Sequence, residues 1–437
     1  MGKNSDMTPP RKCDVVVVGA GLAGLACASR LSATGLDVQV LEACEGVGGR
    51  ARTDRVDGFL LDRGFQVLNT GYPEVRRLMD TDALDLRYFS RAMLLHVRGS
   101  VVRLADPRRE PLAALAAIRA PIGSLRDKAA LAGYAAAVGF VPNSVLLGQR
   151  DRTAEQAWRR YGMTPPVIDR VLRPFFAGLL LENEMTTSGR FANLMMRMFV
   201  RGDSTVPAAG MQALGEQLAA RLPTGSVHLQ TPASSISPLA VETSAGLVAG
   251  RAVVVATDAS AAAALLPGVS APSWKGVTTV YHAAQESPLK QPTLVVDAEK
   301  SPINNTVVVT EAAPSYSSDG RALIATSLVH GPDLDGAAVD ERAMLGHLAR
   351  LYRTSTSGWE RVAAYDVPHA LPSMTAPHEF RKPVRTDGVY VCGDHRDTSS
   401  IQGALVSGRR AADAVLSDLG VVLDESDPPT PPGRNGG

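Results

Sequence analysis

The stretch VVVVGAGLAG, residues 15–24, decides the fold that this sequence predicts. Residues 13–18 form an apolar, β-branched run suited to a strand buried on both faces. Gly19, Gly21 and Gly24 follow in G-x-G-x-x-G spacing, and a helical stretch then closes at Gly35. A second strand, DVQVLE, ends in Glu42. Strand, glycine turn, helix, strand and acid in this order predict a dinucleotide site, which a glycine turn chosen only for packing does not explain.

Each position of this turn has a physical reason. Gly19 permits the tight turn, Gly21 lets the backbone approach a pyrophosphate, and Gly24 lets the helix pack on the strand. The helix N-terminus offers N–H groups and a positive dipole to phosphate, while Glu42 can accept hydrogen bonds from ribose hydroxyls. The predicted cofactor contacts of this unit are Gly19, Ala20, Gly21, Leu22, Ala23, Gly24, Glu42 and Ala43.

A basic, glycine-rich loop follows the second strand. It carries Gly48 and Gly49, then Arg50, Arg52 and Thr53. An arginine side chain suits a pyrophosphate because its planar fork can hydrogen-bond two oxygens. A plain NAD site does not require this loop, whereas a longer cofactor with a flavin could use it. We therefore predict contacts from Gly49, Arg50 and Arg52; the alternative is a solvent-exposed basic loop.

Composition limits the classes of protein that fit. A chain of 437 residues predicts two domains, or one domain interrupted by another. Lys plus Arg (45) nearly equals Asp plus Glu (44), which gives no electrostatic reason to expect nucleic acid. The four cysteines lack metal-type spacing and are expected to be reduced packing residues in a cytoplasmic protein, without a metal. No signal core or membrane-spanning apolar run is evident.

A second glycine-marked turn lies near the other end, in CGDHRDTSSIQGALVSGRRAA, residues 392–412. It has the pattern of a strand end, a Gly-Asp turn, a polar loop and a helix opening on Gly403 and Ala404. Ser399 or Ser400 is the expected helix cap. An ordinary capped helix and a cofactor-binding helix are compatible interpretations of this stretch.

Together the two turns resemble a known family. The run GAGLAGLACASRLSATGLDVQVLEACEGVGGRART is similar to the N-terminal signature of the FAD-containing amine oxidase and phytoene desaturase superfamily, and residues 392–412 are similar to its C-terminal signature. The resemblance implies an α/β fold in which a Rossmann-type FAD-binding domain is interleaved with a mixed α+β substrate domain. It also implies FAD as the cofactor, held at its adenosine end by the first turn and at its flavin end by the second.

The resemblance implies further cofactor contacts. Asp394 would face the ribityl or pyrophosphate region, with the backbone at residues 402–404 under the pyrimidine ring. The regions of Val227, Ala233 and Thr257 match backbone near the adenine end. The full set of contacts added in this way is Gly64, Phe65, Ala233, Thr257, Gly393, Asp394, Ile401, Gln402, Gly403 and Ala404.

The chain between the signatures alternates in character. Residues 91–200 are expected to be mostly helical, residues 277–330 to form several strands, and residues 341–352 a helix. The predicted division is a disordered N-terminus, an FAD-binding domain in three segments, a substrate domain in two segments and a disordered tail. The corresponding ranges are 1–12; 13–90, 203–270 and 375–420; 91–202 and 271–374; and 421–437.

Departures from the family pattern bear on the chemistry. Monoamine-type oxidases place two aromatic side chains before the flavin; here Ser400 stands at the second position and His369 or Ala370 at the first. Thr278 or Thr279 stands where many amine oxidases carry a lysine that is water-bridged to the flavin, and Lys275 is expected to be an exposed lysine ahead of that strand. Both absences favour the desaturase branch, which dehydrogenates C–C bonds.

The substrate is less well defined. Four methionines between Met185 and Met198 could line an apolar tunnel or form an ordinary helical core. His282, His369 and His378 are candidate polar groups, and no catalytic residue is nominated. The leading hypothesis is an FAD-dependent dehydrogenase or desaturase that acts on an apolar, isoprenoid or secondary-metabolite substrate, with O₂ or a quinone as acceptor and a peripheral membrane contact. Alternatives are an amine or protoporphyrinogen-type oxidase, a non-redox carotenoid isomerase-like enzyme, and a non-enzymatic FAD-binding protein.

Overall fold

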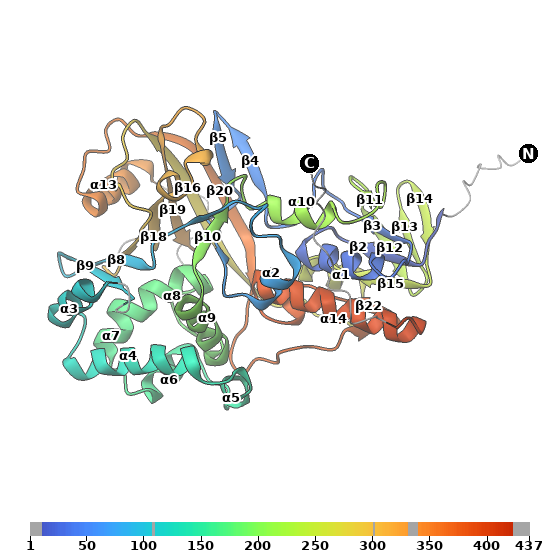
Figure 1. The fold of residues 1–437 in the computed structure, drawn as a ribbon, viewed down its shortest axis with the longest axis horizontal. Helices are drawn as coiled ribbons and strands as arrows, with labels where there is room; N and C mark the ends of the chain where they lie inside the picture. The colour runs from blue at the N-terminus through green and yellow to red at the C-terminus, as the bar shows by residue number, and fades with distance from the viewer. Residues whose placement is uncertain (1–10, 107–109, 300–301, 331–339, 423–437) are drawn as a thin grey trace, which may run out of the picture.

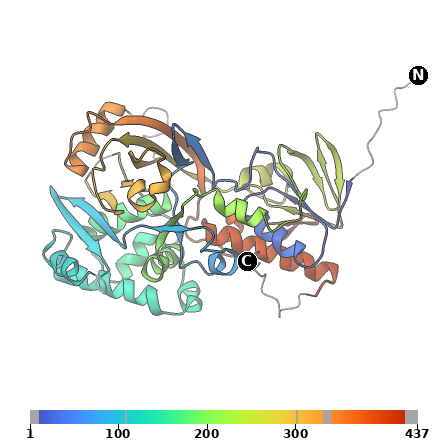
Figure 2. The same ribbon diagram turned by 45° about the horizontal axis from the view of Figure 1, so that its top comes forward.

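Two large sheets lie toward opposite ends of an elongated molecule (Figures 1 and 2). The structure, a computed structural model, describes residues 11–106, 110–299, 302–330 and 340–422. The expected disorder at residues 1–10 and 423–437 therefore falls outside the described residues. Within the described ranges, no helix is both long enough and apolar enough to cross a bilayer.

The sheet that carries the first glycine turn has six strands, all parallel except at one edge. Val15, Val16 and Val17 are fully buried, as a run of β-branched residues in a central parallel strand should be. Its strands come from three distant parts of the chain. In sheet order they are β11 (Val227–His228), β3 (Val38–Leu41), β2 (Val15–Val18), β15 (Ala252–Val255), β22 (Val389–Val391) and β21 (Arg385–Thr386).

Both faces of this sheet are covered. Val15 and Val17 pack in one hydrophobic cluster with α1 (Leu22–Ser32), α10 (Ala213–Ala219) and α14 (Ile401–Leu419). Val16 and Val18 pack in another cluster, with α11 (Ala259–Leu265) and a small four-stranded sheet. The strands of the small sheet are β1 (Arg11–Lys12), β14 (Gly246–Ala249), β13 (Ala240–Thr243) and β12 (Ala233–Ser237).

The larger sheet has seven strands and includes the strands expected between residues 277 and 330. One face packs against α13 (Glu341–Tyr352), whose bounds match the expected helix, and α8 (Arg173–Leu180) contacts its strands as well. The strands in order are β20 (Glu360–Pro372), β16 (Trp274–Ala284), β19 (Ala322–Val329), β18 (Asn305–Val308), β17 (Leu294–Asp297), β8 (Ala92–Val97) and β9 (Ser100–Ala105).

A helical region follows β9, with α9 (Gly189–Arg201) packed against several of the other helices. The other helices of this region are α3 (Pro111–Arg119), α4 (Leu125–Phe140), α5 (Asn143–Gly148), α6 (Ala154–Arg160), α7 (Pro165–Val167) and a π-helical turn, Ile168–Leu172, that continues into α8. The remaining elements are short: β4 (Thr53–Val56), β5 (Phe59–Asp62), β6 (Leu68–Asn69), β7 (Leu86–Tyr88), β10 (Ser204–Pro207), α2 (Pro73–Leu78), α12 (Val309–Ala312) and two 3₁₀ turns, Pro314–Tyr316 and Asp394–Arg396.

The α/β fold class is confirmed, with two local corrections. Residues 92–105 form the hairpin β8–β9 instead of helix, because the short turn between them lets both strands join the larger sheet. Arg11 and Lys12 pair with Val248 and Ala249 as strand β1, so order begins inside the segment that was expected to be disordered. The division into two discontinuous domains stays a prediction.

Candidate functional site

The first glycine turn brings backbone groups into close contact. Gly19 has φ +108°, and a Cβ built on it would lie 2.9 Å from the carbonyl oxygen of Ala256. A Cβ on Gly24 would overlap the carbonyl oxygen of Gly19. Both glycines are therefore required by the packing of α1 against β2 and β15.

Gly21 differs, because within the described residues the space beside it is nearly empty. A Cβ built on Gly21 would meet only the Cα of Gly49, at 3.9 Å. Gly21 is also the N-cap residue of α1, and no side chain among the described residues caps that helix. The first N–H groups of α1 therefore stay available to a ligand, which fits a bound pyrophosphate.

Glu42 is tied to the same turn. One carboxylate oxygen accepts from the backbone N–H of Ala20 at 2.7 Å, and the other accepts from that of Cys44 at 2.9 Å. The residue is 8% exposed. Each oxygen keeps a second lone pair, so Glu42 can hold the turn and still accept from a ribose hydroxyl. Ala43 and Cys44 are exposed beside it, and exposure of Cys44 corrects the expectation that all four cysteines are packing residues.

The loop after β3 places its two arginines differently. The guanidinium of Arg52 donates to Gln212 at 3.2 Å, to the carbonyl of Gly46 at 3.3 Å and to Glu45 at 2.9 Å. Arg52 is 7% exposed, so it braces the loop against the start of α10. These three partners give Arg52 a role in shaping the loop, and its contact with the cofactor stays a prediction.

Arg50 connects the two signatures. It donates to the carboxylate of Asp394 at 2.6 Å and to the carbonyl oxygen of Ala370 at 2.7 Å. The Asp394 side chain is 5% exposed and the Arg50 side chain 37% exposed. Burial lowers the pKa of Arg50 and the Asp394 carboxylate raises it more, so the guanidinium stays charged. A cationic fork with accessible surface, held between the two turns, fits a pyrophosphate.

The two turns share one edge of the six-stranded sheet. β2 and β22 flank β15 in parallel, so Gly19 and Gly393 follow strands that end side by side. A Cβ on Gly19 would lie 3.2 Å from the backbone nitrogen of Thr257, and one on Gly393 would lie 3.5 Å from its carbonyl oxygen. Thr257 therefore lies between the glycines. Ala233 begins β12 in the small sheet, two residues after Thr231, whose N–H donates to the carbonyl of Glu42 at 2.8 Å.

The helix of the second turn begins at Ile401, two residues earlier than Gly403. Its cap is Ser400, whose hydroxyl accepts from the N–H of Gly403 at 3.1 Å. A Cβ on Gly403 would overlap the carbonyl oxygen of Thr398, so the loop itself requires this glycine. The Gln402 side chain accepts from the N–H of Glu74 in α2 at 3.0 Å. Ile401, Gln402 and Ala404 are half-buried, which leaves accessible surface at the start of α14.

Gly64 and Phe65 lie where the first signature meets the larger sheet. Gly64 has φ +94°, and the N–H of Phe65 donates to the hydroxyl of Thr279 on β16 at 3.2 Å. Thr278, on the opposite face of β16, contacts His330 and Asp366, each at 2.9 Å.

Lys275 corrects a prediction. It lies within β16, and its ammonium donates to the carboxylate of Glu182 at 2.8 Å. The side chains of Lys275 and Glu182 are 22% and 1% exposed. The expectation of an exposed lysine ahead of the strand is therefore wrong, because Lys275 forms an ion pair with a buried carboxylate on the connection after α8.

The three histidines occupy different environments. His369 is exposed and stacks on Trp274, with ring centroids 4.8 Å apart, and the guanidinium of Arg50 lies 5.7 Å from the Trp274 ring. His282 is buried against Glu341 of α13, and burial lowers its pKa. His378 lines a small hollow with Asp394, and burial lowers its pKa to about 4. His369 and His378 therefore lie near the second turn, whereas His282 faces α13.

Two buried groups were not found from the sequence. Asp62, at the end of β5, accepts from Thr53 at 2.6 Å, from the N–H of Met211 at 2.9 Å and from the Tyr316 hydroxyl at 2.9 Å. Burial raises its pKa to about 6. His395, beside Asp394, is 5% exposed, and neither ring nitrogen has a hydrogen-bond partner among the described residues. A polar pattern in sequence does not show burial, so nothing singled out either group.

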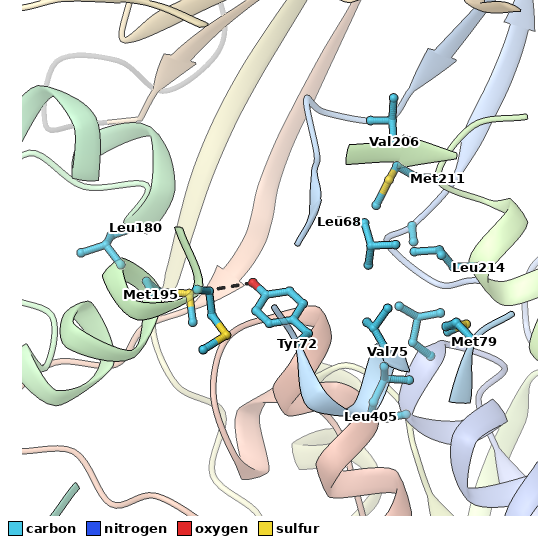
Figure 3. Close-up of a cluster of buried hydrophobic side chains, with 14 of the residues drawn as sticks. Leu68, Tyr72, Val75, Met79, Leu180, Met195, Val206, Met211, Leu214 and Leu405 are labelled. Carbon is cyan, nitrogen blue, oxygen red and sulfur yellow. Dashed lines mark hydrogen bonds between the residues drawn. The ribbon is translucent and has the colours of Figure 1, made fainter. Parts of the chain in front are cut away.

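The methionine-rich stretch is largely core. Met185, Met195 and Met198 are buried, and Figure 3 shows the Tyr72 hydroxyl directed at the sulfur of Met195, 3.9 Å away. This cluster joins the glycine-turn side of the molecule to α8 and α9, because it also contains Leu180 and Leu405 (Figure 3). The half-buried apolar side chains of α8 and α9 include Phe175, Leu179, Leu194, Met196 and Phe199.

Comparison with known proteins adds relatives in several branches. Putrescine oxidase of Kocuria rosea is 31% identical over 241 residues, 51% of this chain and 49% of that protein. The zeta-carotene-forming phytoene desaturase of Myxococcus xanthus is 56% identical over 50 residues, 11% of this chain and 10% of that protein. Protoporphyrinogen oxidase 2 of Arabidopsis thaliana is 33% identical over 114 residues, 26% and 22% of the two chains. The chain thus spans half or less of the length of these curated relatives.

Solved structures share the fold. An oxidoreductase from Methanosarcina mazei superposes with a TM-score of 0.72 at 17% identity, over 92% of this chain and 100% of that one. Putrescine oxidase bound to putrescine superposes with a TM-score of 0.68 at 20% identity, over 94% and 100%. The model of the family described as flavin containing amine oxidoreductase matches residues 22–416. The chain therefore belongs to the flavin-containing amine oxidoreductase family.

Proposed function

We propose that this chain is a dehydrogenase of the desaturase type, which removes a hydride from an apolar substrate of the isoprenoid or secondary-metabolite class. When bound, FAD would supply the hydride-accepting chemistry, with O₂ or a quinone as the final electron acceptor. The protein's own residues position the cofactor and substrate and exclude water, so no conspicuous catalytic acid or nucleophile is needed.

The charge of α8 and α9 is the observation that carries this proposal. These helices hold the half-buried apolar side chains that we infer to line the substrate site. Their charged residues are all cationic: Arg173, Arg190, Arg197 and Arg201. Arg173 is paired with Glu155 and Asp169, and Arg190 lies 3.5 Å from Asp151, so these two arginines are neutralised. Neither helix carries a carboxylate of its own that could pair with a substrate ammonium, which disfavours a protonated amine between them.

The buried acid that follows α8 already has a cationic partner. Glu182 follows α8, but its carboxylate accepts from Lys275 at 2.8 Å, from the Thr186 hydroxyl at 2.8 Å and from the N–H of Thr187 at 2.7 Å. It therefore cannot serve as a free partner for a substrate ammonium without breaking a buried ion pair.

The start of α14 supports the same interpretation. Ser400, which stands where amine oxidases carry an aromatic, is occupied as the helix cap. The aromatic stack of His369 on Trp274 lies beside Arg50, at the position that we assign to the pyrophosphate. Among the described residues we therefore assign no pair of aromatic side chains to positions in front of the flavin ring.

We also propose which part of the cofactor the residues of each turn contact. The N–H groups of α1 and the guanidinium of Arg50 bind the pyrophosphate, and Glu42 accepts from the ribose. Asp394 orients Arg50 and would contact the ribityl region, while Ile401, Gln402 and Ala404, which are half-buried at the start of α14, would contact the flavin. The positive end of the α14 dipole favours the negative charge that develops there on reduction.

The test is anaerobic mixing of the flavin-loaded protein with polyenes, porphyrinogens and amines, followed by absorbance near 450 nm. We expect bleaching by an apolar polyene and none by amines. Bleaching by amines alone contradicts the proposal, as does product formation without bleaching or electron acceptor, which indicates an isomerase. Reoxidation by O₂ compared with a quinone then identifies the acceptor.

Amine oxidation is the second candidate, favoured by the match to putrescine oxidase over 241 residues. In that case the substrate ammonium needs a carboxylate partner, and Glu182 is a buried acid two residues after α8. A Glu182→Gln variant that lost amine-dependent bleaching and raised KM for the amine would support this candidate.

A further inference from the structure

The outer side of α3, α4 and α5 exposes several large apolar side chains. Leu112 is 79% exposed, Leu125 70% and Phe140 72%. Figures 1 and 2 show these helices along the lower left edge of the molecule, away from the six-stranded sheet. We call this surface the α3–α5 face; its large side chains are Leu112, Ile118, Leu125, Phe140 and Val145.

The pattern of α4 is unusual for a helix that faces solvent. Its inner side packs on α9, where the Tyr134 hydroxyl contacts Asn193 at 3.0 Å. Such a helix ordinarily carries charged residues on its outer side. In α4 the only charged residue among those exposed is Arg126, and the others are Leu125, Ala129, Ala132, Gly133, Ala136 and Phe140. The outer side of α4 is thus a continuous apolar strip.

The exposed charges of residues 111–148 have one sign, and Glu110 at the start of α3 is paired with Arg103. Asp127 is the sole acid between residues 111 and 148, and it is 2% exposed because it caps α4 with Ser124. Arg119 and Arg126 are exposed and form no ion pair within the described residues. Lys128 donates to the carbonyl oxygen of Ala120 at 2.8 Å, which ties α4 to the end of α3. The face therefore combines apolar side chains with uncompensated positive charge.

This combination discriminates between two occupants. A second copy of the chain, paired through the same face, would bring Arg119 and Arg126 near their own copies without an exposed acid between residues 111 and 148 to offset them. An anionic bilayer supplies both apolar and negatively charged groups, and helices with an apolar side and basic residues lie at such interfaces.

We propose that the α3–α5 face docks on an anionic lipid bilayer. Leu112, Leu125 and Phe140 enter the boundary of the acyl chains, while Arg119 and Arg126 meet lipid phosphates. This inference rests on the proposed function in one respect: an apolar substrate partitions into membranes, which gives the protein a reason to dock there. α4 and α5 both pack on α9, so the bilayer would lie one helix away from the side chains that we infer to line the substrate site.

The experiment is sedimentation of the flavin-loaded protein with vesicles of phosphatidylcholine containing about 30% phosphatidylglycerol, and with phosphatidylcholine alone. We expect binding to the anionic vesicles, and a loss of about tenfold or more in the variant Leu125→Asp/Phe140→Asp. The matched control is Leu239→Asp/Leu247→Asp, which alters leucines 60% and 43% exposed in the small sheet. This control should bind as the wild type does.

A second pair of variants tests the contribution of positive charge. Arg126→Glu should reduce the preference for anionic vesicles, whereas the control Arg55→Glu on β4 should not. Flavin content equal to that of the wild type shows that each variant is folded. Absence of vesicle binding by the wild-type protein overturns the inference, and so does equal loss in the control variants. If Leu125→Asp/Phe140→Asp converts a dimer to a monomer by light scattering with vesicle binding unchanged, the occupant is a second copy.

These readouts do not depend on substrate. Vesicle binding with no bleaching by any polyene would leave the docking surface standing and overturn the proposed reaction. Bleaching without vesicle binding would do the reverse.

Discussion

Gly21 and Gly24 belong to one turn, but different neighbours require them. A Cβ on Gly24 would overlap the carbonyl oxygen of Gly19, whereas a Cβ on Gly21 would meet only the Cα of Gly49 at 3.9 Å. The fold thus requires Gly24, and a ligand requires Gly21. The glycine spacing predicted both positions, but it could not separate the two reasons, which only the surrounding atoms reveal.

Gly24→Ala is therefore expected to destabilise the protein by about 2 kcal/mol or more, because α1 must move away from β2. Gly21→Ala should change the free energy of unfolding of the cofactor-free protein by less than about 1 kcal/mol while weakening FAD binding. Urea unfolding and FAD titration of both variants check this. Equal effects of the two substitutions on stability would contradict the distinction.

Asp62 is a buried carboxylate with a titration inside the accessible pH range. Burial raises its pKa from the ordinary 3.8 to about 6, so the folded protein binds this proton more tightly than the unfolded chain. The stability gained from the protonated form is complete below about pH 4 and is lost as the pH rises through about 6.

Asp62→Asn should remove this dependence. Relative to the variant, the wild type is expected to lose roughly 2 to 3 kcal/mol of stability between about pH 4 and pH 7.5. Urea unfolding of both proteins across that range measures the difference. A difference that stays constant with pH would show that Asp62 does not titrate as proposed.

The connection between α8 and β16 depends on one ion pair. Lys275 of β16 contacts Glu182, which is 1% exposed and follows α8. Sequence could not predict this contact, because the partners lie 93 residues apart and neither residue type signals burial. The secondary structure of β8 and β9 could not be predicted for the same reason. Their apolar residues fit a helix or a strand, and the pairing of β8 with β17 determines that they are strands.

Lys275→Met should destabilise the protein by about 3 kcal/mol, because Glu182 would stay buried without its cation. The double variant Lys275→Met/Glu182→Leu should recover part of that loss. Thermal or urea unfolding of the three proteins checks the cycle. Since we place Lys275 away from the flavin, the rate of flavin reoxidation by O₂ should be unchanged in Lys275→Met; a large fall in that rate would contradict this placement.

Strands with strong local patterns were predicted well. Residues 15–18, 38–41 and 252–255 are strands of the six-stranded sheet, and α13 has the expected bounds. β-branched runs and helical periodicity are local properties, so a sequence displays them. The side-chain partners of Arg52, Gln402 and His282 are set by the tertiary structure, and their roles were therefore not predictable.

The whole molecule brings together two turns that are far apart in the chain. Arg50 and Asp394 are 344 residues apart in sequence and 2.6 Å apart in space. The family resemblance predicted that both turns hold one cofactor, and the parallel order β2–β15–β22 gives the physical reason, since both turns then open at the same edge of the sheet.

The affinity of the cofactor-free protein for FAD tests this account most directly. Titration by flavin fluorescence would compare the wild type with Gly21→Val in the first turn and Asp394→Asn in the second, using Asp57→Asn in the exposed turn between β4 and β5 as a control. We predict that each of the two turn variants binds FAD at least about tenfold more weakly and that the control is unchanged. Wild-type affinity in either turn variant would contradict the joint site.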